Sequence, residues 1–407
     1  MRQTCDVAII GTGPHGLSLA AHLKSRGIDF RIFGRPMGTW AEHMPKTMML
    51  KSDGFVSNLS APARESTLKA WCARAGVAYA DEGLPISLET FLRYAAWFRK
   101  RYVPELEDTM VTGLETDGEL YTLTLETGER VTARNVVISV GITWFQHTPG
   151  FLSGLPSDLA SHSYDHRDVS RFRGRDVAVI GGGASAVNLV DELANEGARA
   201  RIIARTDAIE YNRIPDASDQ TLFARIQHPP SGIGRGWRSF FCAQAPLLFY
   251  RLPDSLKQRA IRSHMMPAAG FYMRGKIEGR VATSLGRSID RAEAADGKVR
   301  LTLSDPDGRQ EKLDFDHVVA ATGYHPDMRR IPFLAKELCE HITLPDGSPI
   351  ISDSFETPAR GLFVTGPATM SSFGPLMRFM VGAEFAAPRV AARLERRLGA
   401  SSSRSAA

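Results

Sequence analysis

The chain has 407 residues, which is long enough for two or three domains, and 43% of them are hydrophobic, as is typical of a globular protein. These values exclude a fibrous or a disordered chain. The 50 basic and 45 acidic residues give a formal charge of +5, and 40 of the basic residues are arginines spread over the whole sequence. Because no basic cluster stands out from the sequence, we do not expect nucleic acid as a partner.

The four cysteines lie far apart, at Cys5, Cys72, Cys242 and Cys339. Without a C-x-x-C pair we expect neither a zinc site nor a dithiol redox motif, and a reducing compartment fits this pattern. The first strand begins close to the N-terminus, and no apolar stretch approaches the roughly 20 residues of a membrane span. We therefore expect a cytoplasmic protein without a membrane partner, and a disordered tail over 399–407.

A strand, a glycine-rich turn and a helix occur twice in the chain. The first copy has a strand at 7–10 and a helix that ends at Gly27, and the second has a strand at 177–180 and a helix that ends at Gly197. Each copy continues with a second strand, a meander and a hydrophobic strand that ends in glycine. These elements are expected at 30–33, 120–131 and 135–141 in the first copy and at 200–204, 299–313 and 317–323 in the second. The repeat predicts an α/β protein with two Rossmann-like dinucleotide-binding domains that have β-meander crossovers.

The two turns have the spacing that dinucleotide-binding proteins use around a pyrophosphate. The first glycine allows a tight turn, the second lets backbone N–H groups approach the phosphates, and the third small residue permits close packing of the helix. The residues expected at the two phosphate sites are Gly11, Gly13, Pro14, His15 and Gly16 in the first copy, and Gly181, Gly183, Ala184, Ser185 and Ala186 in the second.

The residue that follows each second strand distinguishes the two nucleotides. In the first copy Gly34 stands where an acidic residue would bind the ribose, so backbone groups or Arg35 would have to hold it. In the second copy Arg205 and Thr206 stand at this place, where a cationic side chain would meet the 2′-phosphate of NADP. The second site therefore favours NADPH over NADH, although a solvated surface arginine would give the same pattern.

The segment 209–285 matches no nucleotide-binding element and is rich in aromatic residues. We expect a helical insertion that covers the active site, while a plain helical packing layer would have the same composition. The strand 361–367 returns to the first domain, and a helix is expected from Pro375 through Phe385 with its positive end towards a cofactor. His162 and His166 are four residues apart but lack the glutamate of a zinc motif, so we expect no metal.

With these motifs the sequence resembles the class B flavoprotein monooxygenases, which have two dinucleotide-binding domains, over nearly the whole chain. The resemblance implies that the N-terminal turn holds FAD and the inner turn NADPH. The G-T-W segment that ends at Trp40 resembles an element beside the flavin, and the stretch 316–324 resembles the A-T-G-Y motif of the N-hydroxylases. Further positions that we assign to the cofactors are Gly141, Thr322, Gly323, Tyr324, Gly366, Gly374 and Pro375.

Among these enzymes the stretch 48–53 is most similar to the microbial amine N-hydroxylases, represented by ornithine and lysine N-hydroxylases. In that family the lysine of this stretch lies by the flavin and helps to order the substrate, so the resemblance gives Lys51 this role. Asn58 is a candidate donor to a flavin peroxide, and a turn asparagine is the alternative interpretation. The FAD-binding domain is expected at 1–160 and 315–398, and the NADPH-binding domain at 161–314 with the insertion at 209–285.

The resemblance implies that NADPH reduces FAD, that O2 adds to give a C4a-hydroperoxyflavin, and that one oxygen atom passes to a nucleophilic nitrogen of a small amine or amino-acid-like substrate. Baeyer–Villiger oxygenation or S-oxygenation is the first alternative. A flavin reductase that inserts no oxygen is the second. The sequence leaves the substrate and the oligomeric state, including a homo-oligomer, open.

Overall fold

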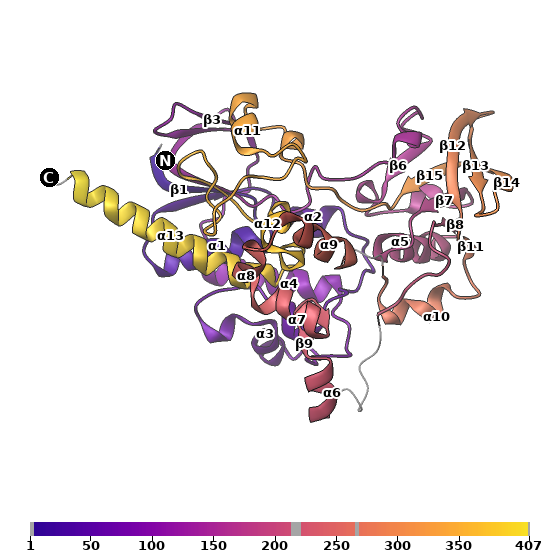
Figure 1. Ribbon diagram of the computed structural model, residues 1–407, viewed down its shortest axis with the longest axis horizontal. Coiled ribbons are helices and arrows are strands. Elements are labelled where there is room, and N and C mark those ends of the chain that lie inside the picture. Colours follow the sequence, from indigo (N-terminus) through magenta and orange to yellow (C-terminus); the bar gives the residue numbers. More distant parts are fainter. Residues whose placement is uncertain (1–3, 213–220, 265–267, 406–407) are drawn as a thin grey trace.

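The computed structural model describes residues 4–212, 221–264 and 268–405, and it has two lobes, each built around its own β-sheet (Figure 1). Within these residues, no helix combines the length and the apolar character that crossing a membrane requires. The α/β class and the two dinucleotide-binding domains predicted from the sequence are confirmed.

The first lobe contains a six-stranded sheet with β1 and β5 at its centre. Parallel strands run in the order β2, β1, β5 and β16, while β4 and β3 continue antiparallel from the N-terminal half of β5. Its strands are β1 (Thr4–Ile10), β2 (Phe30–Phe33), β3 (Val111–Thr116), β4 (Tyr121–Leu125), β5 (Arg130–Ile138) and β16 (Leu362–Val364). The expected end of the meander and the expected closing strand are thus one strand, β5, which first pairs with β4 and then with β16.

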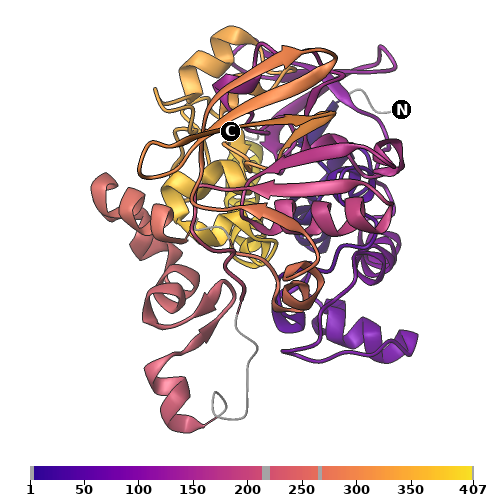
Figure 2. The ribbon, with the colours of Figure 1, turned by 90° about the vertical axis from the view of Figure 1, so that its right-hand side faces the viewer.

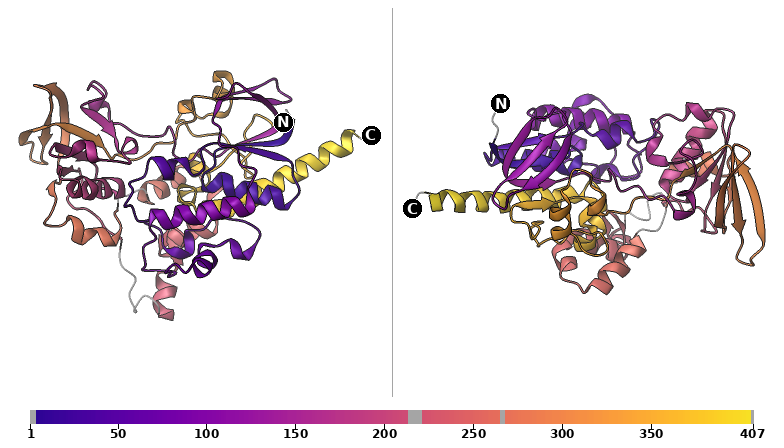
Figure 3. Two further views of the ribbon diagram at one scale, coloured as in Figure 1. Left: turned by 180° about the vertical axis from the view of Figure 1, so that it is seen from behind. Right: turned by 90° about the horizontal axis from the view of Figure 1, so that it is seen from above.

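Helices pack around this sheet, whose central strands are buried. In the first lobe these are α1 (Pro14–Ser25), α2 (Gly38–Glu42), α3 (Leu68–Ala75), α4 (Leu88–Tyr102), α11 (Lys336–Ile342), α12 (Met370–Phe373) and α13 (Gly382–Ser405). The long helix α13 lies along α1, as the left view of Figure 3 shows. It continues to Ser405, beyond the expected domain end at 398, and the disorder expected for 399–407 stays a prediction.

The second lobe contains a five-stranded parallel sheet in the order β11, β8, β7, β15, β6, which faces the reader in Figure 2. A separate antiparallel sheet of β12, β13 and β14 packs against it. The elements are β6 (Ala160–His162), β7 (Asp176–Ile180), α5 (Ala184–Asn195), β8 (Arg199–Ile203), β11 (Ala282–Ser284), β12 (Ser288–Ala295), β13 (Lys298–Ser304), β14 (Gln310–Phe315) and β15 (His317–Ala320). This lobe repeats the strand, turn and helix of the first.

The strand pairing gives domain boundaries that differ from those expected at 160 and 315. Both β6 and β15 pair within the second sheet, so the first lobe ends before Ala160 and resumes only after Ala320. The physical reason is that β15 must lie beside β7 to close the second turn, where the Ala321 carbonyl crowds Gly181. The two linkers that join the lobes pair with each other, since the His147 N–H donates to the Gly323 carbonyl and the His325 N–H to that of Phe145.

The insertion is helical, as expected, but much of it packs on the first lobe. It comprises α6 (Leu222–Gln227), β9 (Pro230–Ser231), β10 (Gly234–Arg235), α7 (Trp237–Gln244), α8 (Pro246–Tyr250), α9 (Asp254–His264) and α10 (Arg274–Ile277), while 213–220 and 265–267 lie outside the described residues. Phe249 and Ile261 pack with Met370 of α12, whereas Met273 and Ile277 pack against the second sheet's helix. The insertion therefore bridges the lobes.

Burial of histidine side chains predicts that acid destabilises the fold. Burial lowers the pKa of His15, His22 and His166 to about 4, so between their ordinary pKa and this value the unfolded chain binds more protons than the folded one. Each imidazole then removes on the order of 1 kcal/mol from the free energy of unfolding by pH 5.5. Urea unfolding at several pH values measures this. A free energy of unfolding that is constant or rises on acidification from neutral pH would contradict it.

Candidate functional site

The first turn is shaped by backbone crowding on two sides and open space on the third. Gly11 has φ +113°, and a Cβ there would lie 2.3 Å from the carbonyl oxygen of Ser139. A Cβ at Gly16 would lie 1.9 Å from the carbonyl oxygen of Gly11, whereas none of the described protein atoms lies within 4 Å of a Cβ at Gly13. Two glycines therefore hold the turn against β5 and α1, and the middle one leaves the room that a phosphate needs.

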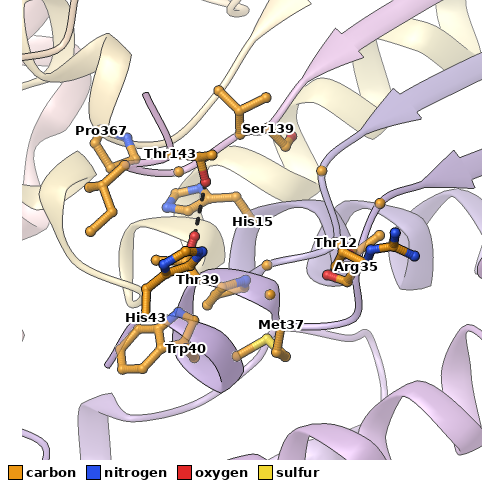
Figure 4. A pocket seen from close by; sticks show the side chains of 18 of the residues that line it. Thr12, His15, Arg35, Met37, Thr39, Trp40, His43, Ser139, Thr143 and Pro367 are labelled. Carbon is orange, nitrogen blue, oxygen red and sulfur yellow. Dashed lines mark hydrogen bonds between the residues drawn. The ribbon is translucent and has the colours of Figure 1, made fainter. Parts of the chain in front are cut away.

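A pocket of about 380 Å³ begins at this turn, at the carboxyl ends of β1, β2 and β5. Figure 4 shows Thr12 and Arg35 at one end of it and Trp40 and His43 at the other. From the set predicted by sequence, the structure brings together Gly11, Gly13, Pro14, His15, Arg35, Trp40, Gly141 and Tyr324 along this pocket. A dinucleotide whose phosphates lie at the turn would extend along it.

His15 is the buried polar group of the turn. Its imidazole is 8% exposed, and neither nitrogen makes a well-formed hydrogen bond with the described residues. Burial lowers its pKa to about 4, an effect that the backbone of Phe379 only partly offsets, so the ring is neutral near neutral pH. A neutral imidazole beside the turn can donate to or accept from a bound cofactor.

The end of the pocket beside β2, where we expect the ribose, lacks the usual carboxylate. This agrees with the sequence, which has Gly34 at that position. Gly34 has φ +136° and contacts the side chain of Thr12. The Arg35 guanidinium lies at the rim and pairs with Asp108 at 3.2 Å and Glu126 at 3.4 Å. These acidic side chains hold Arg35, whose backbone carbonyl also accepts a hydrogen bond from the Thr12 hydroxyl.

The end of the pocket beside Trp40 and His43, here called the inner end, has hydroxyl and aromatic groups that the sequence motifs do not identify. The hydroxyls of Thr39 and Thr143 form a hydrogen bond of 2.9 Å, which is the dashed line in Figure 4. The His43 ring stacks on Tyr164 with centroids 3.7 Å apart, and burial raises the pKa of Tyr164. Tyr164 comes from the second lobe, so both lobes form this end. Thr39 lies within the quoted G-T-W segment, but no sequence pattern connects it with Thr143 or Tyr164.

The C-terminal segment reaches the pocket differently from the expected helix. The chain forms a short 3₁₀ turn, η10 (Pro375–Arg378), and starts α13 only at Gly382, so the continuous helix expected from Pro375 is wrong. Gly374 at φ +86° packs on the Phe249 ring, and Gly366 packs on His15; these close contacts redirect the backbone. The side of the pocket is instead lined by Pro367, Arg378, Phe379 and Met380.

The two residues assigned to chemistry lie outside this pocket. Lys51 has an exposed surface, but partial burial of its ammonium group and the nearby Arg378 guanidinium lower its pKa. Arg378 lines the pocket, whereas Lys51 does not. The Asn58 amide donates to the Phe55 carbonyl at 2.9 Å and accepts from the Leu68 N–H at 2.9 Å, which matches the turn interpretation.

The second turn repeats the crowding of the first. Gly181 has φ +136°, a Cβ there would lie 2.5 Å from the Ala321 carbonyl oxygen, and Gly183 is the N-cap of α5. Ala184, Ser185 and Ala186 form the first turn of that helix. Arg205 is exposed beyond the end of β8 and makes no ion pair with the described residues, and the buried hydroxyl of Thr206 has no hydrogen bond among them. A free guanidinium with a hydroxyl beside it fits a phosphate monoester.

The remaining assigned residues lie in the linker between the lobes. Thr322 donates to the His147 carbonyl, and the Gly323 carbonyl faces Nε2 of His162 at 3.2 Å. The His166 imidazole has a different partner from that of His162, because its Nε2 faces the Ser161 hydroxyl at 2.6 Å. Among the described residues no group of three or more histidine, cysteine, aspartate or glutamate side chains is placed to hold a metal ion.

Comparison with known proteins places the chain in a family. The family described as pyridine nucleotide-disulphide oxidoreductase matches residues 8–223, which is more than half of the chain. The chain belongs to this family. Its four cysteines are free and buried, and none lines the pocket.

Curated relatives of this family member have two kinds of activity. An FAD-dependent urate hydroxylase of Xanthomonas campestris is 26% identical over 218 residues, 50% of this chain and 46% of the relative, so the match spans about half the length of that protein. A ferredoxin–NADP reductase of Ignicoccus hospitalis is 23% identical over 367 residues, 89% of this chain and 90% of the relative.

Solved structures show the same fold. The ornithine hydroxylase of Pseudomonas aeruginosa superimposes with a TM-score of 0.75 at 18% identity, covering 97% of this chain and 100% of the other. The L-lysine 6-monooxygenase of Pseudomonas syringae gives 0.74 at 20% identity, covering 96% and 99%. The chain therefore shares the two-domain fold of these two hydroxylases, the fold that the sequence motifs predicted.

The glycines of the first turn should respond differently to the same substitution. Gly16→Ala forces a methyl group against a backbone carbonyl, so we expect it to cost at least about 3 kcal/mol of unfolding free energy. Gly13→Ala places its methyl in the open pocket and should change stability by less than about 1 kcal/mol. Urea unfolding of the two variants checks this. Equal losses in both would show that Gly13 is also packed against protein.

Proposed function

We propose that the protein is an FAD- and NADPH-dependent monooxygenase that hydroxylates the nitrogen of a small amine or amino-acid-like substrate. The observation that carries this proposal is the pocket itself. It runs from a dinucleotide turn to an inner end with hydroxyl and aromatic groups, and no cysteine lines it. A family member without a thiol at this place has no dithiol to oxidise or reduce, so its electrons need another acceptor, such as O2.

The residues of the two turns fit the two cofactors. The open side of Gly13 and the N-terminus of α1 suit the FAD pyrophosphate, and Arg205 with Thr206 suits the 2′-phosphate of NADPH. When bound, FAD supplies the transfer of electrons from NADPH to O2 that activates one oxygen atom. The assignment of both sites is supported by the fold shared with ornithine and lysine hydroxylases.

The chain itself contributes position and exclusion of water rather than an acid–base pair. Tyr164 and Tyr324 lie at the inner end of the pocket, and burial raises the pKa of both phenols, so they stay protonated near neutral pH. Thr39 and Thr143 add hydroxyls that can orient a bound group. Aromatic walls keep bulk water from that end, which protects a reactive oxygen species from loss.

Lys51 is the residue that we assign to substrate positioning. It lies near Arg378, which lines the pocket, and its lowered pKa reflects partial burial and a like charge. The Lys51 ammonium group would favour a substrate that carries an anionic group, and the substrate amine would then point inwards.

A flavin reductase is the second candidate, because the relative aligned over 89% of this chain is a ferredoxin–NADP reductase. Such an enzyme would pass electrons from NADPH to a protein or a quinone without inserting oxygen. The pocket's inner hydroxyl and aromatic groups would then have no substrate to orient.

One experiment separates these functions. The purified protein is loaded with FAD, and NADPH oxidation, O2 uptake and peroxide release are followed with a panel of diamines, basic amino acids, sulfides and ketones. An amine that suppresses peroxide release and yields a hydroxylamine supports the proposal. Ester or sulfoxide products would favour the Baeyer–Villiger or S-oxygenating alternative, and electron transfer to ferredoxin or quinone with no product in any panel member would favour the reductase.

Removing the charge of Lys51 should uncouple the reaction. In Lys51→Ala we expect NADPH oxidation to continue, while the fraction of electrons released as peroxide rises about fivefold, because the substrate is no longer held in place. Peroxide and product are quantified together. Lys69→Ala, at an exposed ion pair on α3, is the matched control and should stay coupled. Normal coupling in Lys51→Ala would contradict the positioning role.

Removing Arg205 should change nucleotide preference. We expect Arg205→Ala to raise KM for NADPH about tenfold and to leave KM for NADH unchanged, since only NADPH carries the phosphate that the guanidinium would meet. Arg199→Ala, at the opposite end of β8, is the control because Arg199 pairs with Asp176. A uniform rise for both nucleotides would argue that Arg205 has no specific phosphate contact.

A further inference from the structure

The excess positive charge of the chain is concentrated in one part of the structure. The stretch 221–264, which lies between the two undescribed segments of the insertion, has seven cationic side chains and one carboxylate, a formal charge of +6 against +5 for the entire chain. The rest of the chain is thus close to neutral. The cationic residues are Arg225, Arg235, Arg238, Arg251, Lys257, Arg259 and Arg262, and the acidic one is Asp254.

Most of this charge faces solvent. Arg235 pairs with Glu82 at 2.6 Å, and Lys257 is held by Asp254 and the Tyr250 ring. The other five arginines have exposed surfaces and make no ion pair with the described residues. The insertion therefore presents guanidinium groups that nothing in the described chain neutralises.

The same stretch exposes large apolar side chains. Of the nine exposed large hydrophobic residues in the described chain, six lie in 221–264. Leu222 is 78% exposed, Phe223 70% and Ile226 58%, and all three are on the short helix α6; Trp237, at the start of α7, is 61% exposed. Soluble proteins rarely expose a group of large apolar side chains unless the group binds a partner.

The shape of this region favours one kind of partner. Figures 1 and 2 show α6 at the lower end of the molecule, beyond α7 and the β9–β10 hairpin, and no described helix or strand packs extensively against it. Protruding apolar side chains can enter the interface of a bilayer, and exposed arginines of the same insertion can bind anionic headgroups. A symmetric pair of these surfaces in a dimer would instead bring like charges together.

We propose that the stretch 221–264 is a docking surface for an anionic lipid bilayer, with α6 and Trp237 entering the interface and the exposed arginines binding headgroups. The surface neither spans the membrane nor contributes to the dinucleotide pocket. It would bring the insertion, and the pocket edge beside it, next to the membrane.

The test is flotation with lipid vesicles in a sucrose density gradient, using the FAD-loaded full chain. We expect the protein to bind vesicles of equimolar phosphatidylcholine and phosphatidylglycerol and not to bind vesicles of phosphatidylcholine alone. Bound protein should dissociate from the anionic vesicles as the salt concentration is raised. The triple variant Leu222→Ser, Phe223→Ser, Ile226→Ser should lose at least about fivefold in bound fraction. The triple variant Arg238→Gln, Arg259→Gln, Arg262→Gln should lose a similar amount at low salt.

Matched controls change the same chemistry elsewhere. Leu344→Ser with Ile350→Ser removes exposed apolar groups from the first lobe, and Arg130→Gln with Arg134→Gln and Arg173→Gln removes three exposed charges; both should bind like the parent. Thermal unfolding confirms that each variant is folded.

Three results would overturn the proposal. The first is no flotation with the anionic vesicles, and the second is equal binding by both triple variants and the parent. The third is a concentration-dependent increase in mass, measured by light scattering without lipid, that the serine triple variant abolishes, because it would assign α6 to a contact between copies of the chain.

Discussion

The structure depends on one steric constraint, the approach of a backbone carbonyl to the turn that follows a central strand. In the first lobe the Ser139 carbonyl occupies the place of a side chain at Gly11, and in the second the Ala321 carbonyl does the same at Gly181. Side chains can rotate away from a clash, but a backbone carbonyl in a paired strand cannot. Each turn is therefore fixed to the end of the neighbouring strand, where parallel sheets bind their ligands.

The pocket depends equally on how the lobes meet. The segment 39–50 of the first lobe contacts the second repeatedly: Thr47 bonds to Glu192, Lys46 pairs with Asp168, and the Tyr272 hydroxyl donates to the Met49 carbonyl. Thr39 and His43 at the start of this segment face the pocket, and Tyr164 completes its wall from the other lobe. A change in the angle between the lobes would thus alter the inner end of the pocket without altering either turn.

The four cysteines of the chain are free and buried, and none of them lines the pocket. Cys5 and Cys72 are buried, and burial raises the pKa of both thiols, so these side chains pack as small apolar groups. The proposed reaction would therefore depend on what the inner end of the pocket admits and on how well water is kept out. The helical insertion packs on the 375–378 turn, whose Arg378 lines the pocket, and it also contains the concentration of positive charge.

The sequence by itself determined the two strand–turn–helix copies, the glycines of both turns, the missing carboxylate at Gly34 and the position of Arg205. These features are local, because each depends on residues within one βαβ unit. Only the tertiary structure decided that Thr39, Thr143 and Tyr164 meet, that β15 belongs to the second sheet, and that Arg378 reaches the pocket from a broken helix. It also showed that five arginines of 221–264 are exposed and make no ion pair with the described residues. From the sequence alone this cluster could not be distinguished from scattered surface charge. Contacts between distant segments depend on how the lobes pack and on exposure, and neither follows from spacing along the chain.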